Sequence, residues 1–215
     1  MKNKKIRNII ITIIITILVF SIYLLYYYNL IPHKKYNNAD FDIITYKSIA
    51  DYDQDGVDDQ TDILNSARDY VRTRPKYKSK YYNGGYPDDQ YGVCTDVVSF
   101  ALVGAGYDLR QLVTDDIRNN PNNYMISNPD SNIDFRRVKN LNVFFKNNAT
   151  SLTTDLEQID QWQGGDIVVF TKHIAIVSNK RNYRGIPYII HNAGQPVYEE
   201  DAINRYKIIG HYRWK

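Results

Sequence analysis

The chain of 215 residues contains a single cysteine, Cys94, which stands at the start of an apolar helical pattern. A lone cysteine cannot form an internal disulfide, so it is either a small buried side chain or a reactive thiol. Cysteine attacks as its thiolate, and both a helix N-terminus and a nearby imidazole help a thiolate to form. The position of Cys94 therefore favours a nucleophile, provided that a histidine lies beside it.

Two histidines lie at the ends of β-rich runs: His173 opens HIAIVS, and His191 is near the end of PYIIHN. A hairpin centred near Asn182 would place them directly opposite each other on one face of a sheet. A helix carrying Cys94 on that face would meet both rings, with His173 as the base and His191 as the group that orients it. A slip of one residue would bring Asn192 there instead, which makes Asn192 the reserve orienter.

Taken singly, each of these residues is more often structural than catalytic. Their order is more informative: a cysteine on a helix, a histidine on a strand, and a His-Asn pair on the next strand. One or two helices followed by an antiparallel sheet is an α+β arrangement. The C-terminal third contains four β-rich runs, and a helical pattern ends before Pro75, whereas residues 107–149 can be assigned only coarsely.

These motifs resemble two families. The Tyr81–Gly85 stretch, Cys94, Gly165–Val168, His173 and His191 resemble the NlpC-type, papain-like cysteine peptidases of bacterial cell walls. More closely, GVCTDVV, NIDFRRVKNLNVFF, WQGGDIVVF, KHIAIVS, IIHN and GHYRW resemble the bacterial domain-of-unknown-function family 1287, over nearly everything from about Ile63 to Trp214. The resemblance implies a papain-like core in which a Cys-bearing helix packs on an antiparallel sheet.

The resemblance also implies an activity: a cysteine peptidase or amidase that hydrolyses an amide or peptide bond in peptidoglycan or its stem peptides, with no cofactor for catalysis. Two alternatives stay open. The domain could be a non-catalytic cell-wall-binding module, or an acyl or peptidyl transferase that uses the same Cys–His site. The retained Cys94, His173 and His191 argue against a purely binding role, whereas nothing in the sequence separates hydrolase from transferase.

Four more residues are candidates for the site. In the peptidases a tyrosine at the position of Tyr81 lines the site, so its hydroxyl, with the backbone N–H of Cys94, is a candidate oxyanion donor. The peptidases usually continue with Ser-Gly after the cysteine, whereas this chain has Thr95-Asp96. Asp96 either caps the helix or shapes a subsite for a cationic substrate. Arg136 and Arg137 either clamp a substrate carboxylate or pair with a nearby acid.

The N-terminal sequence predicts a membrane anchor. Four basic residues precede a run without charge from Asn8 to Ile31. About 20 apolar residues cross a bilayer, and a basic flank stays on the cytoplasmic side. The run ends in tyrosines, which suit the membrane boundary, and offers no small-residue cleavage site of a signal peptide. We expect residues 1–32 to be a cytoplasmic tip and single-pass cell-membrane anchor, and residues 33–50 to be a polar stalk.

Beyond the anchor, residues 63–215 form the expected extracellular, cysteine hydrolase-like domain. The chain has 27 basic and 24 acidic residues, of which four basic ones belong to the anchor. The outer part is therefore close to neutral, which gives no indication of a nucleic-acid surface.

An acidic loop, DYDQDGVDDQTD (51–62), precedes the first helical pattern of the outer domain. Its spacing matches the ligand positions of an EF-hand loop, with glycine at the sixth position for the sharp turn. The expected ligands of a structural Ca²⁺ are the side chains of Asp51, Asp53, Asp55, Asp59 and Asp62 and the carbonyl of Val57. The alternative is a solvated acidic loop that caps the helix.

Overall fold

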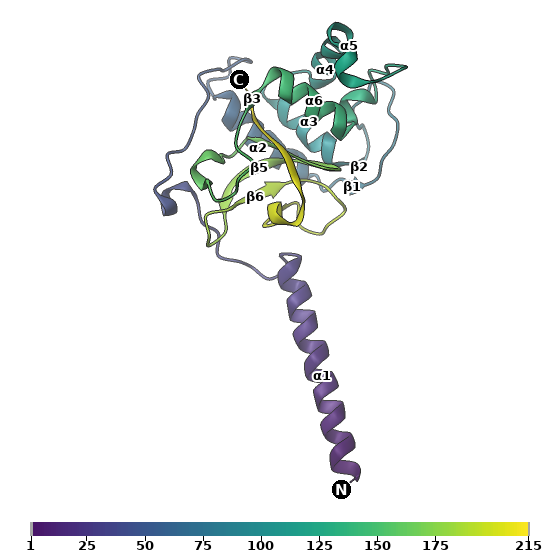
Figure 1. Ribbon diagram of the computed structural model, residues 1–215, viewed down its shortest axis with the longest axis vertical. Helices are drawn as coiled ribbons and strands as arrows, with labels where there is room; N and C mark the ends of the chain where they lie inside the picture. The colour runs from purple at the N-terminus through teal and green to yellow at the C-terminus, as the bar shows by residue number, and fades with distance from the viewer. Residues whose placement is uncertain (1, 215) are drawn as a thin grey trace. The chain divides into compact units, whose positions relative to one another are not determined.

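The computed structural model describes residues 2–214 and has a mixed α+β architecture (Figure 1). The α-helices are α1 (Lys2–Tyr27), α2 (Asp59–Arg72), α3 (Cys94–Gly104), α4 (Leu109–Asn119), α5 (Pro121–Tyr124) and α6 (Val138–Asn148). The 3₁₀ turns are η1 (Asn38–Phe41), η2 (Asp134–Arg136), η3 (Ile159–Gln161) and η4 (Ile203–Arg205). The strands are β1 (Lys76–Tyr77), β2 (Tyr91–Gly92), β3 (Thr150–Ser151), β4 (Ile167–Phe170), β5 (His173–Arg181), β6 (Pro187–Ile190), β7 (Glu199–Glu200) and β8 (Ile208–Arg213).

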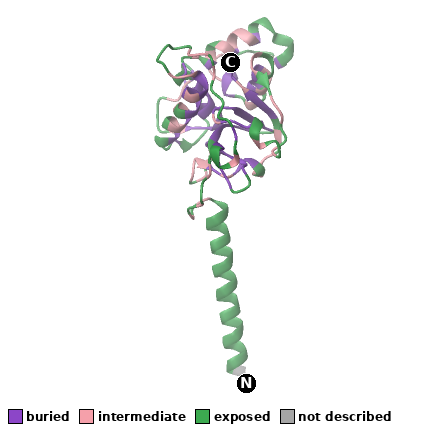
Figure 2. Ribbon diagram, turned by 90° about the vertical axis from the view of Figure 1, so that its left-hand side faces the viewer, coloured by how far each residue is buried: buried purple, intermediate pink, exposed green. Residues whose placement is uncertain are grey.

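Six of these strands form one antiparallel sheet in the order β3-β8-β4-β5-β6-β7. The short strands β1 and β2 pair in parallel in a separate two-stranded sheet. The antiparallel sheet and the α+β class agree with the prediction from the sequence. The central strands β4, β5 and β6 are almost entirely buried, whereas α1 is exposed along its length (Figure 2).

The sheet buries both of its faces, because apolar residues on the strands alternate between two cores. On one face Ile174 and Ile176 pack with α2, α3, α4 and α6. On the other face Ala175 and Val177 pack with Trp162 and with residues around η4. Since β4 and β5 are buried on both sides, their sequences read as continuous apolar runs rather than as alternating ones.

Local sequence explains where the two helices beside the site begin and end. The side chain of Asp58 accepts a hydrogen bond from the backbone N–H of Thr61, so α2 begins at Asp59, ahead of the apolar pattern. Helix α3 begins at Cys94 and ends at Gly104. Gly106 follows with φ of +82°, the left-handed conformation with which glycine commonly ends a helix.

The middle of the chain, which sequence patterns left coarse, supplies α4, α5, η2 and α6. Apolar residues of these helices, among them Leu109, Val113, Leu141 and Phe145, join the core on the helical face of the sheet. The segment is therefore part of the main domain.

Two segments precede this domain. Helix α1, with the residues that follow it as far as His33, forms a separate unit, and Asn3–Tyr27 is long and apolar enough to cross a membrane or to be a signal sequence. The predicted stalk differs from the structure, because part of it packs against the domain. Tyr36 pairs with Arg181, and the buried side chain of Asn38 accepts a hydrogen bond from Arg181 at 2.7 Å. The bond to Asn38 helps to satisfy the buried guanidinium of Arg181, which no local pattern in the sequence had indicated.

Candidate active site

Cys94 is the first residue of α3, which packs against strand β5. The helix starts here because the Asp96 side chain accepts a hydrogen bond from the backbone N–H of Val93 at 2.8 Å. The thiol lies close to the backbone N–H of Ile174, the second residue of β5. The fold therefore brings the first turn of α3 to the beginning of the strand that His173 opens.

The environment of the thiol opposes ionisation. Cys94 is only 7% exposed, and this burial, followed by the negative charge of Asp96, raises its pKa to about 11. The backbone N–H groups of Ile174, Thr95 and Cys94 act in the opposite direction without reversing the shift. A helix N-terminus suggested a thiolate formed easily, but here desolvation outweighs the helix. At neutral pH, Cys94 is a thiol.

The two candidate histidines contact each other directly. Nε2 of His173 lies 2.8 Å from Nδ1 of His191, and both side chains are buried. The expected register is wrong, however: the ladder pairs Ile176 with Ile190, so His191 lies diagonal to His173 rather than opposite. An irregularity between Val177 and Arg181 shifts the hairpin, and because the offset is two residues, both histidines stay on one face.

Glu200 on β7 extends this pair into a row of three residues. Nε2 of His191 lies 3.1 Å from Oε1 of Glu200, and the other oxygen of Glu200 accepts a hydrogen bond from Arg205 at 2.8 Å. A carboxylate only accepts, so Nε2 of His191 carries the proton. In a neutral His191, Nδ1 then accepts from Nε2–H of His173, which leaves Nδ1 of His173 with its lone pair free.

His173 is poised as a neutral imidazole. Burial, and then the neighbouring His191, lower its pKa to about 3. Among residues 2–214 no hydrogen bond to Nδ1 of His173 is formed. The ring stacks on Tyr206 at 5.1 Å between centroids and lies 5.9 Å from the ring of Phe170. Nε2 of His173 is thus held by His191, and Nδ1 is available as a proton acceptor.

The position of α3 relative to this pair differs from the expectation. Cys94, with Ile174 and Ile176, belongs to the helical face of the sheet, whereas His173 contacts Phe170 and Tyr206, which pack on the other face. Period-two alternation relates the two histidines to each other, but it does not say which face a helix covers. Cys94 therefore meets the beginning of β5 through the backbone of Ile174, and in the described part of the chain no hydrogen bond joins its sulfur to the ring of His173.

Asn192 is not a second orienter. Its amide donates to the carbonyls of Pro75 at 2.9 Å and Gly92 at 3.2 Å, and its side-chain oxygen accepts from the N–H of Gly194. All of these bonds run to backbone, so its amide is committed away from His173. Its effect is to fasten the segment just before Cys94 to the strand end that carries His191.

Tyr81 forms no hydrogen bond with Cys94 among the described residues. It is 59% exposed, and its hydroxyl accepts a hydrogen bond from Asn132 at 3.0 Å. The tyrosine within electrostatic range of the sulfur is Tyr77, whose pKa is raised by burial and then by the charge of a Cys94 thiolate. The role of Tyr81 as an oxyanion donor stays a prediction, and no spacing rule in the sequence indicated Tyr77.

The proposed substrate-binding charges are occupied within the fold. Arg136 and Asp96 form a buried two-point ion pair, with Nε to Oδ1 at 2.7 Å and an Nη2 to Oδ2 bond of 2.9 Å. Arg136 also donates to the carbonyl of Lys80 at 2.6 Å. This pair fixes the start of α3 and has no free donor surface for a substrate. Arg137 is exposed and lies 3.8 Å from Asp134, so only Arg137 is accessible from solvent.

The acidic loop lies at the beginning of α2. Carboxylate oxygens of Asp51, Asp53 and Asp55 gather within 4.8 Å of one another. Asp59 differs from the expectation, since its two oxygens accept from the N–H of Tyr52 and the hydroxyl of Tyr107. It is therefore turned toward the protein and away from the other acids.

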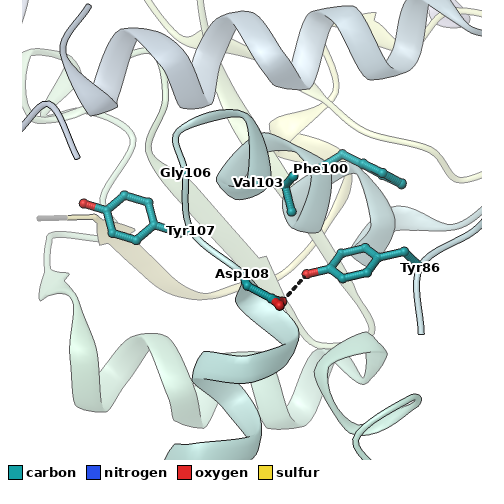
Figure 3. A pocket seen from close by; sticks show the side chains of 6 residues that line it. All are labelled: Tyr86, Phe100, Val103, Gly106, Tyr107 and Asp108. Carbon is teal, nitrogen blue, oxygen red and sulfur yellow. Dashed lines mark hydrogen bonds between the residues drawn. The ribbon is translucent and has the colours of Figure 1, made fainter. Parts of the chain in front are cut away.

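A pocket near the far end of α3 contains none of these residues. It is lined by Tyr86, Phe100, Val103, Gly106, Tyr107 and Asp108 (Figure 3). The hydroxyl of Tyr86 donates to Asp108 at 2.8 Å across its mouth. Since Cys94 is at the first turn of α3 and Val103 near the last, this pocket is separate from the Cys–His region.

Comparisons with known proteins give a family but no activity. Residues 64–214 match the model of a family described as Domain of unknown function (DUF1287). The chain is also similar to the uncharacterized protein YijF of Escherichia coli (strain K12), with 38% identity over 149 residues, which are 65% of this chain and 72% of that protein. The matched region contains Cys94, His173, His191 and Glu200.

Proposed function

The chain belongs to the DUF1287 family, and from its Cys–His–His–Glu arrangement we propose that it is a membrane-anchored cysteine hydrolase that cleaves an amide or peptide bond. One observation carries this proposal most: Glu200 and His191 hold His173 in the tautomer that leaves Nδ1 free at the strand end where Cys94 lies. A base held by a second group and oriented toward a nucleophile is the arrangement that acyl transfer requires.

The similarity of the motifs to NlpC-type cysteine peptidases supports a papain-like core. In that reading α3 is the helix that carries the nucleophile, and β5 and β6 carry the base and its orienting histidine. Strands β5 and β6 are neighbours in one antiparallel sheet, and helices pack on one face of that sheet. This arrangement is compatible with a papain-like core. Peptidoglycan or its stem peptides are the proposed substrate class because that peptidase group acts on bacterial cell walls.

Chemistry begins from a neutral pair, because the pKa of Cys94 is raised and that of His173 is lowered. As sulfur attacks the carbonyl carbon of the amide, the thiol proton passes to Nδ1 of His173 and a C–S bond forms. His191 accepts the Nε2–H bond from His173 throughout, and Glu200 keeps the proton of His191 on its Nε2. Substrate binding must therefore favour proton transfer that the free protein disfavours.

The proton then goes to the leaving group. His173 gives it to the amine nitrogen as the C–N bond breaks, which leaves a thioester on Cys94. A water molecule attacks the thioester carbon, and its proton passes to Nδ1 of His173. The C–S bond breaks, sulfur regains a proton, and a carboxylic acid leaves. If an amine takes the place of water, the same residues catalyse a transfer.

The apolar N-terminal helix bears on where the domain acts. Asn3–Tyr27 is long and apolar enough to cross a membrane, and basic residues flank its N-terminal end. By the positive-inside rule we propose that this end is cytoplasmic and that the domain lies outside the membrane. An enzyme held there has access to the inner layer of a cell wall.

The test is a digestion of purified peptidoglycan fragments by the full chain in detergent micelles, with products identified by mass spectrometry. We expect fragments that have gained one water at an amide, with loss of about 10³-fold or more of the rate in Cys94→Ala and His173→Ala. Glu200→Gln should lower the rate roughly 10- to 100-fold and change its pH profile, since its role is to position a proton rather than to touch substrate.

Asp69→Asn, at an exposed ion pair on α2, serves as the matched control and should keep full activity. Fragments joined without uptake of water would replace hydrolysis by transfer. A product that persists in Cys94→Ala, or a folded parent protein that releases none, would overturn the proposed activity.

A further inference from the structure

Three carboxylates of the acidic loop before α2 lie close together. Oxygens of Asp51, Asp53 and Asp55 lie within 4.8 Å of one another, which is the spread that a single cation with oxygen ligands at about 2.4 Å can span. Two of the three side chains are exposed and one is half-buried. Acidic groups on a surface are common, so this cluster alone does not define a site.

An independent feature lies beside the cluster. Asp62, in the first turn of α2, is only 8% exposed, and its Oδ2 is buried without a hydrogen-bond partner. An unpaired buried carboxylate oxygen is costly, and most such atoms in proteins have a partner. The nearby charges that act on this carboxylate most are those of Asp55 and Asp53. This buried oxygen is therefore close enough to the cluster to be affected by its charges, and it has no hydrogen-bond partner among the described residues.

The other two acids of the loop are already used by the protein. Asp58 caps α2 through its bond with the N–H of Thr61, and its Oδ1 also accepts from the N–H of Ser48 at 2.9 Å. Asp59 is fully buried and binds the N–H of Tyr52 and the hydroxyl of Tyr107. Asp58 and Asp59 are therefore held by groups outside the acidic cluster, whereas Asp51, Asp53 and Asp55 accept backbone N–H groups of the loop itself, from Asp55, Gly56 and Val57.

We propose that this loop binds one Ca²⁺ through the side chains of Asp51, Asp53, Asp55 and Asp62 and the backbone carbonyl of Val57. The donors are all oxygens at the spacing of an EF-hand loop, which suits Ca²⁺. Mg²⁺ demands near-ideal octahedral geometry and keeps several waters, so a flexible cluster of this kind discriminates against it. Asp59, an expected ligand from spacing alone, is not part of the set.

The ion stabilises the fold. It ties the loop to the first turn of α2, and α2 packs against α3, the helix that begins at Cys94. The loop is already fixed on its other side, because Tyr52 stacks on Tyr107 at 4.3 Å between ring centroids. Calcium binding should therefore raise stability without contributing to the chemistry of the thiol.

The test uses the full chain in detergent micelles, freed of metal with a chelator and dialysed. Thermal unfolding is then followed with CaCl₂ or MgCl₂ added. For dissociation constants of about 10⁻⁴ to 10⁻³ M, 10 mM Ca²⁺ should raise the melting temperature by roughly 3 to 10 °C, and Mg²⁺ by much less. Calorimetric titration should give one Ca²⁺ per chain.

Asp62→Asn and Asp53→Asn should each abolish the calcium response while leaving alkylation of Cys94 unchanged. Asp53 is exposed, so its replacement tests the site even if the buried position does not tolerate change. Asp69→Asn, on the same helix outside the loop, should respond like the parent. A parent protein whose melting is indifferent to calcium, or an Asp53→Asn variant that still responds fully, would overturn the site.

Discussion

Two histidine–carboxylate pairs lie in the same sheet, His191 with Glu200 and His211 with Asp166, and they differ in what remains free. In the second pair both ring nitrogens of His211 are occupied: Nδ1 lies 2.7 Å from the carbonyl of Thr153 and Nε2 lies 2.9 Å from Asp166. The ring also stacks on Trp162 with centroids 3.7 Å apart. Nothing in this pair is available to a substrate.

The first pair continues to a third residue with a free end. His191 uses one nitrogen on Glu200 and the other on His173, and no hydrogen bond to Nδ1 of His173 is formed within residues 2–214. The carboxylates differ as well. Asp166 accepts from Gln60, His211, Arg213 and the N–H of Gln163. A buried histidine is therefore a candidate catalytic base only when one of its ring nitrogens, or one in a histidine bound to it, has no hydrogen-bond partner.

The electrostatics of Asp166 follow from this saturation. Burial alone would raise its pKa, but hydrogen bonds from His211 and Arg213 hold the pKa below its ordinary value. The ionised carboxylate is thus the hub that joins α2, the Gly-Gly-Asp turn and β8. Its role is to hold the sheet, in contrast to the positioning role of Glu200.

Of the two carboxylates, we expect Asp166 to contribute more to the free energy of unfolding. Asp166→Ala leaves His211 and Arg213 without their shared acceptor, and we expect a loss of roughly 3 to 5 kcal/mol in the free energy of unfolding, measured by urea denaturation of the full chain. Glu200→Gln, which keeps an acceptor for His191, should cost less, about 1 to 2 kcal/mol. Glu157→Ala, at an exposed pair with Arg184, is the control and should stay within about 0.5 kcal/mol. Equal losses at Asp166 and Glu200 would remove the distinction between the two pairs.

A smaller change in the free energy of unfolding is expected when the pH falls, because His173 is held neutral in the folded protein. Its pKa is about 3 in the folded protein against 6.5 in the unfolded chain, so the unfolded state binds the proton first as pH falls. Stability is therefore lost from about pH 6.5 downward. Between pH 7 and 4.5 the parent should lose about 2 to 3 kcal/mol more than His173→Gln, measured by urea denaturation at each pH. Parallel pH profiles for the two proteins would mean that His173 is not held neutral by the fold.

Much of the fold could be predicted from local sequence. The strand runs, the helix that starts at Cys94, the glycine that ends it and the apolar N-terminal helix follow from period, capping and length. The helices between residues 107 and 149 were not assigned, because Asn, Asp and Pro interrupt their apolar pattern. Their packing on the sheet stabilises what local propensity leaves undecided.

The site was predictable only in part. Spacing indicated that His173 and His191 share a face, because that relation needs only alternation along two strands. Glu200 was missed, since it reaches His191 from a short strand whose pairing no local pattern specifies. For Asp96 and Arg136 the sequence left two roles open, substrate binding or a cap and an ion pair, and it did not indicate that the two residues pair with each other across 40 residues of chain. Such long-range pairing is invisible to any local rule.

The central claim is that His173, through its open Nδ1, serves Cys94. It is tested most directly by the rate at which iodoacetamide alkylates Cys94 in the folded, full-length protein at pH 7.5. We expect His173→Gln to lower this rate about tenfold or more, because the thiol loses the group that takes its proton. His211→Gln, which changes the closed pair, should leave the rate unchanged. Equal rates in the parent and His173→Gln, or alkylation only after denaturation, would contradict the account and make Cys94 a buried structural residue.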